Sequence, residues 1–192
     1  MVSNAQESNV KQFKKLSCPE KWWVIWHPFV AKKAMKISQM ARETTKIIQQ
    51  QKLLRGSGNG DQVDAFRHTF WMANLTRQIG WRKAKKLGKA HEKGNYRDYR
   101  KHRKEDGTFP DKAGSEMDLY NNIVGILIGN MKSDVELEDL VISFIEKGMC
   151  KIIKTDRAGN FLDCDGKIIP AENLKGKWKN EKCLVNSDDL SE

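Results

Sequence analysis

The sequence predicts a mainly α-helical protein, a bundle of about five or six helices followed by a small C-terminal β-hairpin. Apolar residues recur at three- and four-residue steps in successive stretches up to residue 148, and glycine, proline or a capping pattern lies between these stretches. Beyond residue 149, short apolar runs alternate with turn residues. We therefore expect a polar lead-in at 1–18, a helical domain at 19–148, a β-hairpin appendage at 149–185 and a frayed tail at 186–192.

The first predicted element is a short helix that contains Trp22, Trp23 and Trp26. Three tryptophans in five residues suit a membrane interface, because an indole has an apolar body and a polar N–H. The run is too short to anchor a protein alone, so we favour a helix that closes over the core. Pro28 then begins a long amphipathic helix of about 25 residues, which the glycine-rich segment 55–60 ends.

Two further helices follow, separated by Gly80. The first runs from about Gln62 to Ile79, with Asp61 as its expected N-cap, and the second from Trp81 to about Glu92. In the next segment, 93–104, six Lys/Arg residues surround two tyrosines. Such a segment can stack bases and hold phosphates, yet an exposed helix or loop has the same composition.

The last predicted helices run from Lys112 to about Met131 and from a capping-box pattern at Ser133 and Glu136 to about Gly148. Glycines in the first of these helices allow a neighbouring helix to approach closely. Three short apolar runs, 150–154, 160–163 and 167–169, are separated by turn residues. They predict the strands of the β-hairpin appendage.

Composition fits one folded domain with a cationic surface. The chain has 192 residues, of which 39% are hydrophobic and 31% charged, so a core can form. A formal net charge of +10 attracts an anionic partner, either nucleic acid or a membrane surface. A solvated basic surface accounts for the same charge without any partner.

Targeting and cysteine patterns point to a soluble chain. No stretch reaches the ~20 apolar residues that span a bilayer, and the N-terminus lacks the pattern of a signal peptide. We expect a cytoplasmic protein, or a secreted one if a leader was trimmed. The cysteines, Cys18, Cys150, Cys164 and Cys183, contain no CxxC pair, so a structural zinc site is not expected. The last three either form one disulfide in an oxidising compartment or remain reduced.

The candidate site begins with Asp64 and His68, which lie four residues apart on one helix and therefore share a face. Trp71 and Leu75 continue this face, so the pair is expected to point inward. A carboxylate beside an imidazole fixes its tautomer and raises its basicity, which suits a general base or a metal ligand. Buried polar groups also need partners, so other helices should supply them.

Two other predicted helices carry polar residues where a hydrophobic residue would cost less. They are His91 with Glu92, and Asp118 with Asn121 and Asn122. His68, His91 and Asp118 would satisfy a divalent metal such as zinc with an open position, while a remaining acid activates water. Without a metal, the same groups suit general acid–base hydrolysis.

Each residue of the predicted constellation has an expected role. His68 is the base or metal ligand, Asp64 orients it, and His91 is a second base or ligand. Glu92 and Asp118 are the acids, and Asn122 is a positioning donor. The alternative is that these residues form a buried polar network that only joins the helices.

Three motifs in this region resemble a family of uncharacterised bacterial helical domains, some of which lie at the ends of toxin-like polypeptides. The motifs are Asp64-Ala-Phe-Arg-His-Thr-Phe-Trp71, Ala90-His-Glu92 and Met117-Asp-Leu-Tyr-Asn-Asn122 followed by Gly125. The resemblance covers roughly residues 60–130. It implies residues of interest but no reaction. This chain has Tyr120 where members of the family often have His, which weakens a metal site that needs a third imidazole.

The sequence therefore favours a hydrolase-like effector domain that acts on an anionic or phosphate-containing substrate. The main alternative is a non-enzymatic basic protein that binds nucleic acid or an anionic membrane, with a purely structural polar cluster. It predicts an affinity that falls steeply with salt and survives the loss of His68. A third alternative, a structural or partner-binding domain, predicts that loss of Asp64 or His68 costs stability alone.

Overall fold

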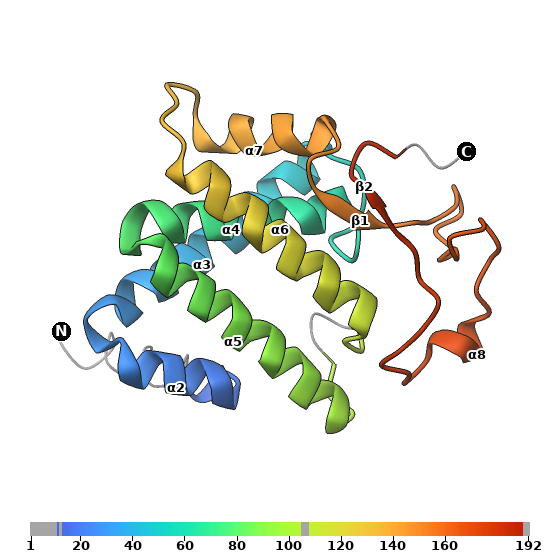
Figure 1. The fold of residues 1–192 in the computed structure, drawn as a ribbon, viewed down its shortest axis with the longest axis horizontal. Helices are drawn as coiled ribbons and strands as arrows, with labels where there is room; N and C mark the ends of the chain where they lie inside the picture. The colour runs from blue at the N-terminus through green and yellow to red at the C-terminus, as the bar shows by residue number, and fades with distance from the viewer. Residues whose placement is uncertain (1–10, 12, 105–107, 190–192) are drawn as a thin grey trace.

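The computed structural model describes residues 11, 13–104 and 108–189, and it is mainly helical (Figure 1). The principal helices are α2 (Cys18–Trp26), α3 (Pro28–Gln50), α4 (Gln62–Ile79), α5 (Trp81–Arg100), α6 (Lys112–Asn130) and α7 (Leu137–Glu146). A short helix, α8 (Ala171–Leu174), and a two-stranded sheet of β1 (Lys151–Ile153) and β2 (Leu184–Asn186) follow. The predicted fold class, a helical bundle with a small sheet near the C-terminus, is confirmed.

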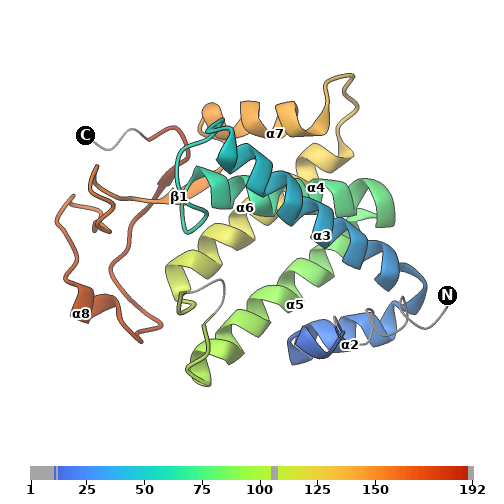
Figure 2. The same ribbon diagram turned by 180° about the vertical axis from the view of Figure 1, so that it is seen from behind.

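Helix α4 is the centre of the bundle. Figures 1 and 2 show it between α6 on one side and α3 on the other, and it also packs against α5, α7 and β1. Most of its side chains are buried, including Phe66, Phe70, Met72 and Leu75. A polar side chain on α4 therefore has protein around it on nearly every side.

Glycines on α6 allow the closest of these helix contacts. A Cβ at Gly125 would collide with the carbonyl oxygen of Thr69, and one at Gly129 would lie 2.7 Å from the carbonyl oxygen of Ala73. Only a residue without a side chain permits α6 to approach α4 this closely. The contact places the polar residues of α6 directly against those of α4.

Side-chain caps fix where several helices begin. Ser17 and Glu20 form a capping box at α2, Asp61 accepts from the backbone N–H of Asp64 at 3.1 Å, and Asp111 accepts from that of Gly114 at 2.8 Å. The prediction of a capping box at Ser133 and Glu136 is wrong. Helix α7 has Glu136 as its N-cap residue and no side-chain cap.

Helix α5 is longer than predicted, because it continues beyond Glu92 through most of the basic segment to Arg100. Packing stabilises this extension. Gly94 lies against the side chain of Ser17 at the start of α2, and Asn95 is buried. Tertiary contacts thus override the helix-breaking tendency of a glycine here.

The small sheet pairs β1 with β2 in antiparallel register, Ile152 opposite Val185. Its first strand lies within the predicted run 150–154, but its second strand is not one of the predicted runs. Residues 160–163 and 167–169 instead contribute isolated bridges, Thr155 with Phe161 and Leu162 with Ile168. A disulfide joins Cys164 to Cys183, one of the two states that the sequence left open.

The C-terminal residues pack against α7 as far as the structure describes them. Asn186 lies in β2, and the hydroxyl of the buried Ser187 donates to the carbonyl oxygen of Ile145 at 2.7 Å. Residues 190–192 of the predicted frayed tail lie outside the described residues. Among the described residues, no helix is both long and apolar enough to cross a membrane.

Candidate functional site

His68 lies at the junction of α4 and α6 and is buried. Its Nε2 atom is 3.6 Å from the Oδ1 atom of Asp64, one turn earlier on α4, and 3.4 Å from the Oδ1 atom of Asp118 on α6. Both aspartates are buried as well. The predicted meeting of an acid–imidazole pair on one helix with an acid on another therefore occurs.

The backbone and a neighbouring arginine hold Asp64 in place. The N–H of Gly60 donates to its Oδ2 atom at 2.8 Å, and the Nη2 atom of Arg67 donates to its Oδ1 atom at 2.6 Å. The same guanidinium nitrogen is 3.4 Å from Nε2 of His68. The guanidinium is thus a positive charge beside the carboxylate that faces the imidazole.

Donor atoms of Asp64, His68 and Asp118 all lie within 4.8 Å of one another. One imidazole nitrogen and two carboxylate oxygens at this spacing are a donor set that can close on one divalent cation. The predicted metal set had His91 in place of Asp64. We name Asp64, His68 and Asp118 the Asp–His–Asp cluster.

His91 lies near the cluster but is oriented by another residue. Its ring centroid is 6.0 Å from that of His68 and 5.6 Å from that of Trp71. Its Nδ1 atom is 3.1 Å from the Oε1 atom of Glu20 on α2. His91 thus joins α5 to α2 while its ring faces the histidine of the cluster.

Glu20 is a site residue that the sequence analysis missed. Its Oε2 atom accepts from the backbone N–H of Ser17 at 2.8 Å, and its Oε1 atom contacts His91. Burial alone would raise its pKa, but the hydrogen bond and charge of His91, together with Ser17, lower the pKa to about 2. The Ser-x-x-Glu pattern from residue 17 to residue 20 was the signal that could have identified it.

The structure gives Glu92 and Asn121 hydrogen bonds with other partners. Glu92 accepts from the hydroxyl of Ser115 at 2.7 Å and from the amide of Asn95 at 3.2 Å, which ties α5 to α6. Asn121 exchanges hydrogen bonds of 2.9 and 2.8 Å with the backbone of Lys151 in β1. These contacts hold the elements that surround the cluster.

Asn122 is buried beside Gly88 and the imidazole of His68. Burial lowers the pKa of His68 well below its ordinary value, and the charges of Arg67 and His91 lower it further, while the Asn122 amide opposes the shift. The imidazole is therefore neutral near pH 7, the form in which it accepts a proton or ligates a metal.

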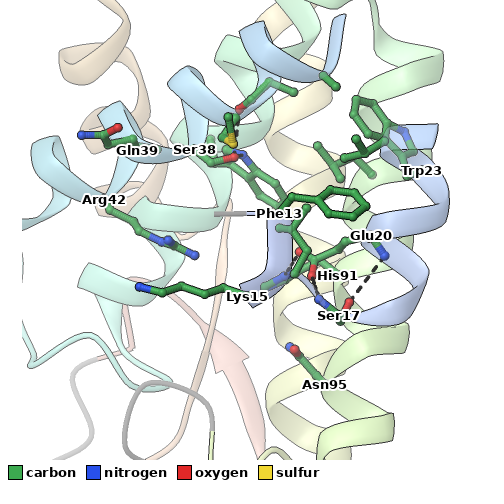
Figure 3. A pocket seen from close by; sticks show the side chains of 18 of the residues that line it. Phe13, Lys15, Ser17, Glu20, Trp23, Ser38, Gln39, Arg42, His91 and Asn95 are labelled. Atoms are coloured by element: carbon green, nitrogen blue, oxygen red, sulfur yellow. Dashed lines mark hydrogen bonds and ion pairs between the residues drawn. The ribbon is translucent and has the colours of Figure 1, made fainter. Parts of the chain in front are cut away.

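A cavity of about 830 Å³ is lined by His68 and by His91, the second of which is labelled in Figure 3. Helices α2, α3, α4 and α5 line it, and much of its wall is apolar, including Trp23, Met35, Trp71 and Leu87. Five of the described lining residues are basic and two are acidic. They are Lys15, Lys32, Arg42, Arg67 and Lys104, against Glu20 and Asp98. The cavity is apolar with a cationic excess, which suits an anionic ligand with an apolar body.

The two tyrosines of the basic segment are engaged within the protein. The ring of Trp178 in the C-terminal segment is 4.8 Å from that of Tyr96 and 5.2 Å from that of Tyr99. Their faces are therefore partly used in packing. A base that stacks on the ring surfaces in contact with Trp178 would have to displace it, whereas Tyr96 keeps 43% of its surface exposed.

Comparison with known proteins places the chain in a family. A family model, described as a domain of unknown function (DUF6973), matches residues 21–152, which is more than two thirds of the chain. The chain belongs to this family. The DUF6973 match includes the whole Asp–His–Asp cluster and His91, but it begins one residue after Glu20. Neither the curated proteins nor the solved structures gave a match.

Proposed function

We propose that this DUF6973 domain is a hydrolase for an anionic substrate, with a phosphate ester as the first candidate. The observation that carries the proposal is the position of His68, which lines the cavity and contacts the carboxylates of Asp64 and Asp118. Burying an imidazole and two acids costs folding stability that hydrogen bonds and charge pairing offset only in part, and such clusters gather at functional sites. The position of this imidazole in the cavity lining favours chemistry over a purely structural network.

The Asp–His–Asp cluster is proposed to hold a divalent cation such as zinc. Three protein ligands leave positions open, and a cation bound there would polarise the substrate and lower the pKa of a bound water. Arg67 now has its guanidinium beside the Asp64 carboxylate and also lines the cavity. It can therefore turn toward the cavity and bind a substrate phosphate through paired N–H donors.

The remaining residues orient the substrate and the second imidazole. Lys15 and Arg42 both extend into the cavity (Figure 3) and supply positive charge away from the cluster. His91, held by Glu20, is proposed as the acid that protonates the leaving oxygen. Glu92 and Asn122 support the adjoining helices. The toxin-like context of the motif resemblance fits an effector role for such a hydrolase.

Calorimetric titration of the metal-stripped full chain with ZnCl2 and MnCl2 tests the cation site. We expect saturable binding by the wild-type chain and its loss in Asp118→Asn and His68→Gln. Asp98→Asn changes another acid of the same cavity and is the matched control, which should bind as the wild type does. Circular dichroism establishes that each variant is folded.

Hydrolysis of bis(p-nitrophenyl) phosphate and p-nitrophenyl phosphate, with each metal added, tests the reaction. Loss of a residue that transfers protons or holds the metal lowers rates by about 100-fold or more, so His68→Gln should lose at least this much. Asp98→Asn should retain most of its activity. A folded wild-type chain that binds neither metal and cleaves neither ester would contradict the proposal, and so would a His68→Gln variant as active as the wild type.

A further inference from the structure

The outer face of α2 and the start of α3 carry large apolar side chains that the protein does not cover. Trp22, Ile25 and Trp26 are 57%, 56% and 75% exposed, and Phe29 is 99% exposed. The first three occupy positions i, i+3 and i+4 of α2 and therefore share one face. We name these four residues the aromatic face.

Trp23 shows that α2 is already anchored by its opposite side. It is 5% exposed, and its indole N–H donates to the carbonyl oxygen of Lys83 on α5 at 3.2 Å. The prediction that this helix closes over the core thus holds for Trp23, whereas its two neighbouring tryptophans point outward. Core packing does not account for the aromatic face, because its side chains contribute little to the core.

The stretch of sequence that contains the aromatic face, residues 21–42, carries charge of one sign. From Lys21 to Arg42 the sequence contains five Lys/Arg residues and no Asp or Glu. Lys32, Lys33 and Lys36 are exposed on the first turns of α3, next to Phe29. Any partner of this face must therefore accept both aromatic side chains and a surplus of positive charge.

We propose that the aromatic face docks on an anionic lipid membrane. Indole rings favour the boundary between headgroups and acyl chains, and each nearby lysine adds attraction to anionic headgroups. An apolar face or a basic patch alone binds membranes weakly, and stable attachment takes two such signals. This surface has both within two consecutive helices.

The aromatic face adjoins residues of α2 and α3 that line the cavity. Lys32 lines the cavity and lies three residues after Phe29, so the two share a face of α3. Docking would therefore bring the cavity close to the headgroup layer. Membrane binding itself does not depend on the proposed hydrolase activity, and the two can fail separately.

Co-sedimentation of the full chain with large unilamellar vesicles tests the proposal. We expect binding to phosphatidylcholine vesicles that contain 30% phosphatidylglycerol, at least about tenfold weaker binding to phosphatidylcholine alone, and weakening by 0.5 M NaCl. Trp26→Ala/Phe29→Ala should lower the partition coefficient about tenfold or more, because two exposed rings lose their contact with the interface. Lys33→Gln/Lys36→Gln should weaken binding most at low salt.

A matched control removes exposed apolar side chains elsewhere. Met149→Ala/Ile168→Ala changes residues that are 52% and 58% exposed, one just after α7 and one just before α8, and should bind as the wild type does. Both views of the fold show α7 and α8 away from α2. Equal binding by Trp26→Ala/Phe29→Ala, or no binding of the wild type to anionic vesicles, would overturn the proposal. A dimer that the same double substitution disperses would instead assign the aromatic face to a second copy of the chain.

Discussion

At the residue scale, the candidate site depends on charges that neighbouring side chains balance within the protein. His68 is neutral through burial and lies between two carboxylates, and Arg67 offsets the charge of one of them. Glu20 places a carboxylate beside the imidazole of His91, and it also belongs to the capping box that begins α2. A single substitution at one of these residues should therefore disturb the balance of charges in the site while the protein stays folded.

Glu20→Gln should alter how stability depends on pH. Because the folded-state pKa of Glu20 is lowered from 4.5 to about 2, its ionisation stabilises the protein above pH 4.5, and this contribution is lost as the pH falls toward 2. A shift of this size corresponds to at most about 3–4 kcal/mol. Urea unfolding at several pH values should show Glu20→Gln less stable than the wild type at pH 6, with the difference shrinking toward pH 2.

An exposed glutamate provides the control for this measurement. Glu43→Gln, on the outer side of α3, should change stability by little at any pH. A difference between wild type and Glu20→Gln that stays constant from pH 7 to pH 2 would show that the Glu20–His91 pair does not lower the pKa of this carboxyl.

At the scale of the elements, the site exists because α6 approaches α4 closely enough for Asp118 to reach His68. Gly125→Ala would place a methyl group against the carbonyl oxygen of Thr69 in α4. We expect a loss of about 1–3 kcal/mol in the free energy of unfolding, since neither backbone can move without disturbing the core. Urea denaturation followed by circular dichroism measures this loss.

Gly114→Ala is the control for this measurement. It tests whether the loss of stability in Gly125→Ala comes from the close contact between α6 and α4 and not from alanine itself. Its new methyl group would have ordinary contact with Asp111, at 3.4 Å from Oδ1, and alanine favours a helix more than glycine does. Stability should stay equal or rise. If both variants lost the same free energy, close packing at Gly125 would not be what holds α6 to α4.

Much of the site was predictable from local patterns, and the rest depended on contacts between distant segments. Asp64 and His68 share a face through helical periodicity, and Asp118 interrupts an apolar face, so each was visible in the sequence. The Ser-x-x-Glu pattern marks Glu20 only as a capping residue; its contact with His91 and the cavity were not visible, because four helices must pack before the cavity exists. The second strand was missed because β2 lies 30 residues beyond β1.

At the scale of the whole molecule, the cavity, the cationic excess and the aromatic face meet on the side of α2 and α3. The DUF6973 match spans residues 21–152, which include the aromatic face, the Asp–His–Asp cluster and most helices of the bundle. The sequence beyond β1 adds the disulfide segment and Trp178, which covers the basic end of α5. The separation of a helical domain from this appendage stays a prediction.

The most direct test of the central claim is anomalous diffraction from crystals of the full chain grown with zinc and recorded on both sides of the zinc absorption edge. We predict an anomalous peak within about 2.0–2.2 Å of His68 Nε2 and of one carboxylate oxygen each from Asp64 and Asp118, with Arg67 turned toward the cavity. Crystals in which Arg67 still bridges Asp64 and His68, with no zinc peak at the cluster, would contradict the account.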